Sequence, residues 1–341
     1  MRTINDPKAL GDPKEVVLII PDPPLEGIAG FQLLKLLNEM GYKVHLMNTY
    51  RGGTGIRSLV ENHIRGLWLL RHSGKKVICR DGYRVFLIVT LMKALGSDIL
   101  QWWGIDPLAV AGARSKIFPF FVRYMTKWLC KIGDVLVNID PLSERSVREV
   151  CGKRQRILLE PLDLAPFINA RTERKGDYFL FPARVAREKR VHILLEAARK
   201  YGLNVVMTGD IQDKKYWREI SYMVDGERIK HIGKLGIEEL AKVMASAKAT
   251  VIPSYAEGVS SSAIQSLTAG TSVVIPRAGG YEFLQSVCSG VFTFEPEGLT
   301  PDTLYDLMIQ ASEVIPTCDI ARFDGRRAWM ELLSEFIEGH Q

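Results

Sequence analysis

Two cations in one short segment are the first residues whose types and spacing could do chemistry. Arg184 and Lys189 lie between an apolar run, 178–181, and a helical pattern that begins at about Val191. They therefore follow a predicted strand, at the edge where parallel sheets hold their ligands. A guanidinium binds phosphate oxygens through a planar fork, and an ammonium supplies a compact charge. Together they could stabilise a departing phosphate group, whereas taken alone the cluster is more often a solvated basic loop.

The second candidate segment, residues 253–270, reads PSYAEGVSSSAIQSLTAG and follows another predicted strand. Its serines are good helix caps, so the helix that they open would direct free amides and the positive end of its dipole toward a ligand. Gly258 permits a phosphate or sugar to approach the backbone closely. Glu257 could accept hydrogen bonds from sugar hydroxyls. By itself, an acid that merely complements the helix dipole is the commoner interpretation.

Short β-branched runs alternate with longer helical stretches, which is the pattern of βαβ units and parallel sheets. The predicted strands cover residues 16–20, 43–47, 76–79, 99–103, 135–139, 157–159, 178–181, 204–207, 229–232, 250–252, 272–275 and 291–294.

A break at residues 160–163 and a polar stretch at 172–177 place a hinge between the sixth and seventh strands. We therefore predict an α/β protein of two Rossmann-like, doubly wound parallel-sheet domains that face each other across a cleft. The N-terminal domain would span 1–163 and the C-terminal domain 164–320. Residues 321–341 would form a helix that could pack back on the first domain.

The composition is that of a globular protein, with 47% hydrophobic and 25% charged residues in a chain of 341. The amino terminus lacks the apolar stretch of a secretory signal, and no apolar run approaches the roughly 20 residues that span a bilayer. These features predict a cytoplasmic protein. The five cysteines are an odd number without a CxxC pair, and we expect reduced core residues.

Several motifs together resemble the second-domain signature of retaining GT-B glycosyltransferases, the GT4 family of glycosyl transferases group 1. The resemblance covers about residues 177–340 well and the first half loosely. It rests on order and spacing, and the motifs are Arg184 with Lys189, Pro253-Ser254, Glu257-Gly258, Ala269-Gly270-Thr271, and Gly279-Gly280 with Glu282.

The resemblance implies a hexosyltransferase-like enzyme that moves a sugar from a nucleoside-diphosphate-sugar to a saccharide or lipid-linked acceptor. No metal or other cofactor would be needed, and anomeric configuration would be retained. Arg184 and Lys189 would bind the donor diphosphate, and Glu257 would hold hydroxyls of the transferred sugar. Donor-binding positions would also include Gly27, Gly258, Val259, Ser260 and Gln265.

The sequence departs from the family pattern at two places. Gln265 stands where relatives usually carry a second glutamate for the ribose hydroxyls, and a neutral amide loses charge-assisted strength there. In the first domain, Trp103 and Asp106 stand where relatives often place a histidine and glycine. Trp103 could stack on a sugar ring or simply pack in the core, and Asp106 could bind an acceptor hydroxyl.

The basic surplus belongs to the first half. Residues 1–163 hold 24 Lys and Arg against 16 Asp and Glu, a balance of +8, whereas the remainder holds 21 against 23. Residues 114–131 combine five cations and five aromatics without an acid. This pattern is typical of an interfacial helix on an anionic membrane, and also of a helix that packs its aromatics inward.

Three alternatives to the transferase differ in class. A sugar-nucleotide epimerase on the same fold would need acid and base groups that we do not find. A non-catalytic or weakly active sugar-nucleotide-binding protein would explain Gln265. A nucleic-acid-binding protein would explain the basic half but leaves Arg184, Lys189 and Glu257 without a purpose.

Overall fold

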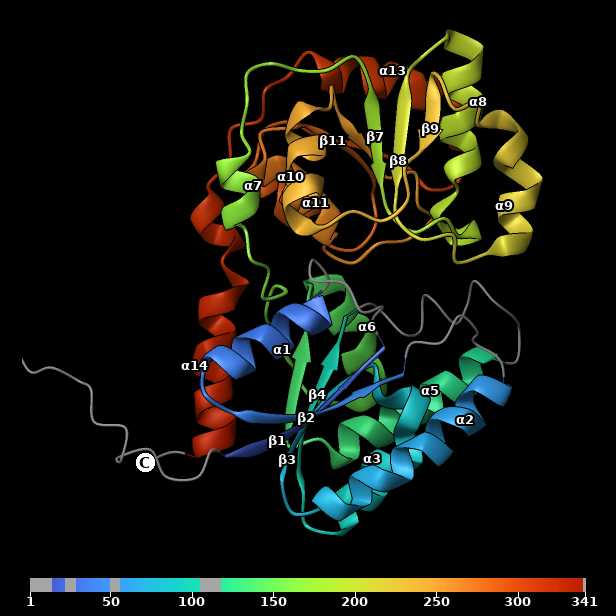
Figure 1. The fold of residues 1–341 in the computed structure, drawn as a ribbon. Coiled ribbons are helices and arrows are strands. Elements are labelled where there is room, and N and C mark those ends of the chain that lie inside the picture. The colour runs from blue at the N-terminus through green and yellow to red at the C-terminus, as the bar shows by residue number, and fades with distance from the viewer. Residues whose placement is uncertain (1–13, 22–28, 50–55, 105–117, 340–341) are drawn as a thin grey trace, which may run out of the picture.

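The computed structural model describes residues 14–21, 29–49, 56–104 and 118–339, which fold into two α/β domains (Figure 1). Within these residues the N-terminal domain has a six-stranded parallel sheet in the order β2-β1-β3-β4-β5-β6. Its strands are β1 (Glu15–Ile20), β2 (Lys43–Asn48), β3 (Lys76–Arg80), β4 (Asp98–Trp103), β5 (Val135–Asn138) and β6 (Arg156–Ile157).

The C-terminal domain repeats this plan in the part of the chain that the structure describes. Its six parallel strands follow the order β12-β11-β10-β7-β8-β9. They are β7 (Phe179–Pro182), β8 (Val205–Thr208), β9 (Ile229–His231), β10 (Thr250–Val251), β11 (Val273–Pro276) and β12 (Val291–Phe294). The carboxyl ends of the two sheets face each other across the domain boundary (Figure 1).

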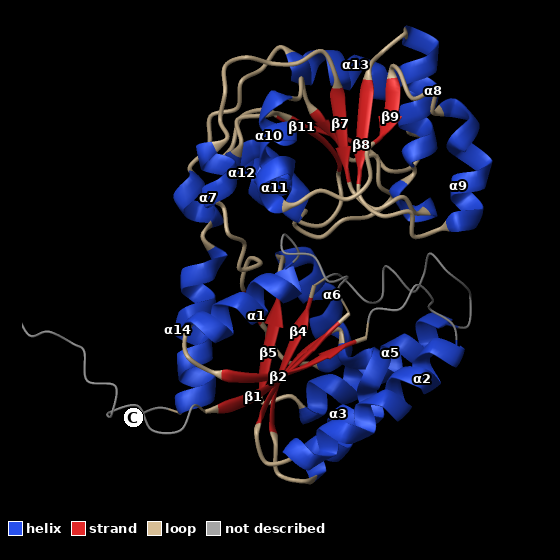
Figure 2. Cartoon of the chain, in the orientation of Figure 1, coloured by secondary structure: helices blue, strands red, loops and turns tan. Residues whose placement is uncertain are grey.

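Helices cover both faces of each sheet (Figure 2). In the N-terminal domain they are α1 (Ala29–Glu39), α2 (Ile56–Gly66), α3 (Phe86–Ala94), α5 (Phe118–Ile132) and α6 (Pro141–Cys151), with short 3₁₀ helices η1 (Leu67–His72) and η2 (Gly82–Val85). In the C-terminal domain they are α7 (Ala165–Asn169), α8 (Val191–Tyr201), α9 (Lys214–Ile220), α10 (Ile237–Ser246), α11 (Ser261–Thr268), α12 (Tyr281–Val287) and α13 (Pro301–Ser312), with η3 (Arg187–Lys189), η4 (Ser221–Met223) and η5 (Ile320–Phe323).

The sequence explains this architecture locally. Strand β1 is apolar along almost its whole length and its last five residues are buried, as expected when helices cover both faces of a parallel sheet. Helix α6 shows how the helices are bounded: the Asp140 side chain accepts a hydrogen bond from the Ser143 amide, Pro141 opens the first turn, and Gly152 ends the helix with φ +69°. The predicted fold of two doubly wound domains is confirmed.

The last helix, α14 (Gly325–Glu338), returns to the N-terminal domain (Figure 1). Trp329 is fully buried there, donates a hydrogen bond to the Leu159 carbonyl at 2.8 Å, and meets the Trp102 ring at 4.8 Å. The first residue of this helix, Gly325, lies directly against the backbone of Leu159 and Glu160. The chain therefore crosses between the domains twice, and the two crossing segments touch.

No helix among the described residues has the length and apolar character needed to cross a membrane.

Four cysteines form disulfides, Cys130 with Cys151 and Cys288 with Cys318, whereas Cys79 is a buried free thiol. The expectation of five reduced thiols is therefore wrong for four of them. The sequence could not show the pairing, because the partners are 21 and 30 residues apart and meet only through the fold. The first pair joins α5 to α6, and the second joins two segments that form an antiparallel β-bridge.

The disulfides predict a specific thiol count. Protein that is purified without reductant and denatured should react with one equivalent of a thiol reagent, and with five after reduction. Five equivalents without reduction would contradict the pairing. The result also bears on location, because structural disulfides persist in oxidising compartments and are rare in the cytosol.

Candidate functional site

The site is built first from the loop after β7, which places Lys189 toward the domain boundary. The loop runs from Pro182 through η3 to Arg190, whose backbone has φ +47° and starts α8. Lys189 donates to Glu257 Oε1 at 2.5 Å, and both side chains are largely buried, at 14% and 13% exposure. The structure therefore brings together two of the predicted residues, one from each segment.

Arg190 holds the two segments in place, and sequence reasoning missed it. Its guanidinium donates to three backbone carbonyls, those of Pro253 at 2.9 Å, Ser254 at 3.1 Å and Pro296 at 2.6 Å. Burial lowers the pKa of Arg190 from its usual value, as expected of a cation that is partly removed from water. An αL conformation at a non-glycine residue just before a helix costs energy, so this anchoring offsets local strain.

Arg184 lies apart from the Lys189–Glu257 pair. Its guanidinium contacts Gln212 and forms an ion pair with Glu188 at 3.2 Å, and its side chain is 43% exposed. Among the described residues, no hydrogen bond or ion pair joins Arg184 to Lys189 or Glu257. The expected three-residue cluster is thus a largely buried pair with a third, exposed cation on the loop that carries Lys189.

The mouth of α11 forms the other wall of the site. Ser260 is the N-cap of this helix, and Ser262 in its first turn donates to the Pro182 carbonyl at 2.9 Å, which joins the helix to the end of β7. Val259 is buried, and Gln265 lies buried in the middle of the helix. The N-terminal end of α11, with the first-turn amides that a helix leaves without intrahelical partners, therefore lies beside Lys189 and Glu257.

Two glycines press against this mouth from the loop after β11. Gly279 has φ +58°, and a Cβ added there would collide with the carbonyl oxygen of Glu257. The Gly280 amide donates to the Gly258 carbonyl at 3.3 Å. Only glycine fits at these two positions, because a Cβ would collide with the backbone or side chain of residues 257–259. The Gly279-Gly280 pair therefore sets the position of the Glu257 backbone.

The N-terminal domain touches the site at the ends of β4 and β5. A Cβ added to Gly258 would lie 2.6 Å from Ile139 Cδ1 and 3.5 Å from the Gly104 carbonyl oxygen. Trp103, which immediately precedes Gly104, is fully buried in the core beneath the sheet. Its ring has no exposed face for a sugar, so packing is the interpretation that the structure favours. Gly27 and Asp106 lie outside the described residues.

A buried ion pair at the hinge is a second feature that sequence reasoning missed. Arg80, at the end of β3, donates to Glu160 at 2.8 Å, and its guanidinium lies over the Trp102 ring at 4.5 Å. The other carboxylate oxygen of Glu160 accepts from Ser261, the first residue of α11. The available signal was an acid between Leu159 and Pro161, two residues without charge. The contacts from Arg80 through Glu160 to Ser261 therefore join α11 to the sheet of the N-terminal domain.

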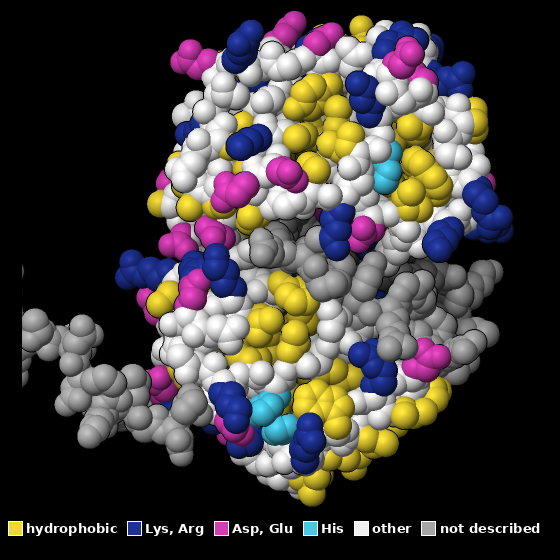
Figure 3. Space-filling model, viewed as in Figure 1, with side chains coloured by type: hydrophobic (Ala, Val, Ile, Leu, Met, Phe, Trp, Pro, Cys, Tyr) yellow, Lys and Arg dark blue, Asp and Glu magenta, His cyan; other side chains and the backbone are white. Residues whose placement is uncertain are grey.

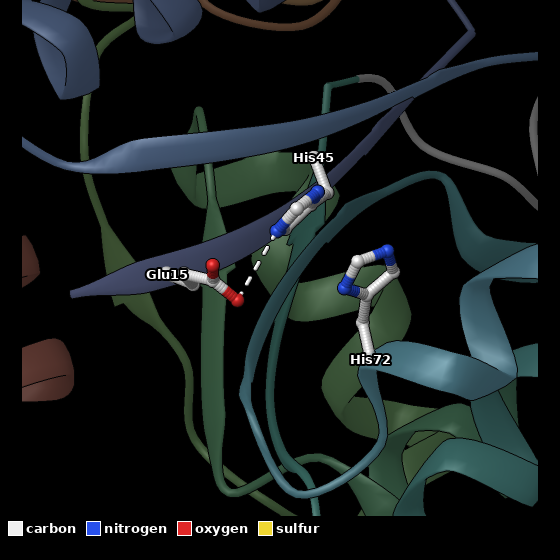
Figure 4. Close-up of side chains that lie close together, drawn as sticks. All are labelled: Glu15, His45 and His72. Atoms are coloured by element: carbon white, nitrogen blue, oxygen red, sulfur yellow. Dashed lines mark ion pairs between the residues drawn. The ribbon is translucent and has the colours of Figure 1, made fainter. Parts of the chain in front are cut away.

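One group of described side chains has the geometry of a metal site, and it lies at the opposite edge of the N-terminal sheet. Glu15, His45 and His72 come within 4.8 Å of one another (Figure 4). Hydrogen bonds from Lys43, Lys75 and His45 lower the pKa of Glu15 to about 2. Two ammonium groups on the same carboxylate oppose a divalent cation, and the group begins at the amino end of β1, far from the mouth of α11.

Comparisons with known proteins give a matching family model and several structures of similar fold. Residues 167–312 match the model of the family described as glycosyl transferases group 1. Curated proteins give no match. Among solved structures, HepE of Anabaena, in complex with UDP and glucose, has a TM-score of 0.70 at 13% identity, covering 94% of this chain and 99% of that one.

Two further solved structures share the fold. Sucrose-phosphate synthase of Thermosynechococcus elongatus has a TM-score of 0.68 at 15% identity, over 95% of this chain and 96% of that one. The catalytic domain of starch synthase IV from Arabidopsis thaliana, bound to ADP and acarbose, has a TM-score of 0.62 at 12% identity, over 96% and 100%. The chain therefore has the two-domain GT-B fold. The family model matches the domain that carries Lys189 and Glu257.

Proposed function

We propose that this chain is a glycosyltransferase that moves a sugar from a nucleoside-diphosphate-sugar to a saccharide or lipid-linked acceptor. The observation that carries the proposal is the largely buried Lys189–Glu257 pair at the mouth of α11, inside the segment that matches glycosyl transferases group 1. The similar structures hold UDP with glucose in one case and ADP with acarbose in another, so these nucleotides are the first to test.

In the proposed mechanism the positive groups of the site bind the diphosphate and the carboxylate binds the sugar. Lys189 and the first-turn amides of α11 would neutralise the diphosphate, whose charge grows as the bond to the sugar breaks. Glu257 would accept hydrogen bonds from the sugar hydroxyls and so place the anomeric carbon. In the structure Lys189 and Glu257 neutralise each other, so neither charge is buried alone before the donor arrives. Arg184, exposed on the same loop, would complete the phosphate contacts.

The finer assignment is to the retaining GT4 group, working without a metal. Its support is the order of motifs from Arg184 to Glu282. In such a mechanism the leaving phosphate takes the proton of the incoming hydroxyl on the same face of the sugar. The positive groups of the chain would carry the electrostatic work that a metal ion does in other transferases.

Nucleoside diphosphates should stabilise the folded protein. A ligand that binds only the native state at about 100 times its Kd adds about 2.7 kcal/mol to the free energy of unfolding. We expect UDP or ADP to raise the melting temperature by several degrees, with an unchanged shift in the presence of EDTA. Differential scanning fluorimetry with UDP, ADP and GDP measures this, and Lys189→Ala should remove most of the shift.

The outcomes separate the alternatives. Stabilisation by a nucleoside diphosphate without transfer or hydrolysis of labelled donors would favour a non-catalytic binding protein, an alternative that the Gln265 departure supports. No shift with any of the three nucleotides would contradict the proposed site. Transfer that stops on addition of EDTA and returns with Mg²⁺ would contradict metal independence.

A further inference from the structure

Three helical segments of the N-terminal domain each expose a stripe of large apolar side chains. The first runs from α2 into η1, the second lies on α3 with the residue that follows it, and the third lies near the start of α5. All nine side chains are exposed, by between 43% and 82%, and they are Val60, Ile64 and Leu67, then Leu87, Leu91 and Leu95, then Phe120, Phe121 and Tyr124. We call these nine residues the apolar face.

Helical spacing makes each stripe continuous. Val60, Ile64 and Leu67 follow one another at intervals of four and three residues, and Leu87, Leu91 and Leu95 at intervals of four. Helices α3 and α5 also bury a second apolar stripe in the domain core, including Ile88, Met92 and Leu129. These two helices are therefore apolar on two sides, although packing on the sheet requires only one.

The three stripes lie side by side. The Leu87 amide donates to His63 of α2 at 3.3 Å, and the Phe86 ring meets Phe121 of α5 edge to face at 6.4 Å. Figure 3 shows hydrophobic side chains along the lower right rim of the N-terminal domain, where Figure 1 places α2, α3 and α5. Single exposed apolar residues need no explanation, whereas a contiguous group of this size marks an interaction surface.

Basic residues border the apolar face. Arg123, Lys127 and Lys131 form an exposed stripe along α5, next to the one that contains Phe120 and Tyr124. Residues 118–132 contain no Asp or Glu. On the far side, Arg65 and Arg71 are exposed beside the stripe of α2 and η1. A surface with an apolar centre and a cationic border matches anionic lipid headgroups over an acyl layer.

We propose that the apolar face rests on an anionic membrane surface, with the basic stripe of α5 at the headgroups. The sequence predicted one interfacial helix in residues 114–131, of which residues 114–117 lie outside the described part and are not included in the apolar face. The apolar face extends that prediction to three helical segments. A second copy of the chain fits less well, because a symmetric contact through this face would bring the two cationic borders together. The proposal does not depend on sugar transfer, so the two can fail separately.

Vesicle co-sedimentation tests the proposal on the full chain. We expect binding to phosphatidylcholine vesicles that contain phosphatidylglycerol, and much weaker binding to phosphatidylcholine alone or at high salt. The double variant Leu91→Ser/Phe120→Ser should lower the partition coefficient at least roughly tenfold, since each side chain loses the free energy of apolar burial. Lys127→Glu/Lys131→Glu should lower it by a similar factor, and only with the anionic vesicles.

A matched control comes from the other domain. Ile315 is 75% exposed after α13, so Ile315→Ser removes a comparable apolar side chain outside the apolar face and should leave vesicle binding unchanged. Melting temperature and nucleotide stabilisation check that each variant folds. The salt dependence of vesicle binding by the unmodified protein tests the proposal without any substitution. Equal binding to both vesicle types, no binding, or a concentration-dependent dimer that Leu91→Ser/Phe120→Ser dissolves would each overturn the proposal.

Discussion

Lys189→Ala and Glu257→Ala are each expected to lower sugar transfer at least roughly a hundredfold, which corresponds to about 2.7 kcal/mol of lost transition-state stabilisation. Lys189 supplies a largely buried positive charge beside the mouth of α11, and Glu257 is its partner at 2.5 Å. Initial rates with a labelled donor at saturating concentration measure the effect. Arg187→Ala is the matched control, since Arg187 is a cation of the same loop that pairs with Glu219 instead.

A purely structural role for the pair would give a different result. Removing one partner leaves the other charge buried and destabilises the fold, whereas removing both restores much of that stability. The double variant Lys189→Ala/Glu257→Ala should therefore melt close to the unmodified protein and still fail to transfer sugar. Recovery of turnover in the double variant, or normal turnover in both single variants, would refute the assignment of these residues.

Gly279→Ala should also lower transfer, by roughly a hundredfold, because a displacement of about 1 Å at a reacting group can cost that much. An added Cβ would collide with the Glu257 carbonyl oxygen and meet Gly258 Cα at 2.7 Å, so the whole Glu257-Gly258 backbone would have to move. The effect should be seen in steady-state kinetics as a loss of kcat/KM, with weaker stabilisation by the nucleotide.

Gly226→Ala separates this effect from simple backbone strain. Gly226 also has positive φ, at +79°, but a Cβ there would meet nothing within 4 Å. Both variants carry the cost of a left-handed alanine, roughly 1–2 kcal/mol of stability. Only Gly279→Ala should impair catalysis. Equal kinetic losses in the two variants would show that the contact with Glu257 has no special role.

The sequence predicted most strands closely because most are short apolar runs bounded by polar or glycine-rich turns. β6 differs most: it was expected at 157–159 and is observed at Arg156–Ile157, with both residues exposed. β12 was expected at 291–294 and is observed at Val291–Phe294. The meeting of Lys189 with Glu257 was also predictable. Both follow strands of one parallel sheet, and β7 and β10 are neighbours in it, so their carboxyl ends lie at the same edge.

The positions of other side chains depend on tertiary packing, which no local sequence pattern indicates. Arg184 has the same strand context as Lys189, yet its exposed side chain turns toward Gln212 and Glu188. Trp103 alternates with Trp102 along β4, and only the sheet decides that both are buried. Arg80 and Glu160 are 80 residues apart, and their ion pair exists only because the hinge passes the end of β3.

The contact of Gly325 with Leu159 and Glu160 limits how the two halves can move. A single connecting segment between two domains permits rotation in any direction, whereas two connecting segments in contact at one point favour rotation about an axis through that point. Rotation about this axis would open and close the space between Lys189 and the first sheet. It would also carry α14 along with the sheet that it completes, so a protein cut after residue 163 would lack part of its own interior.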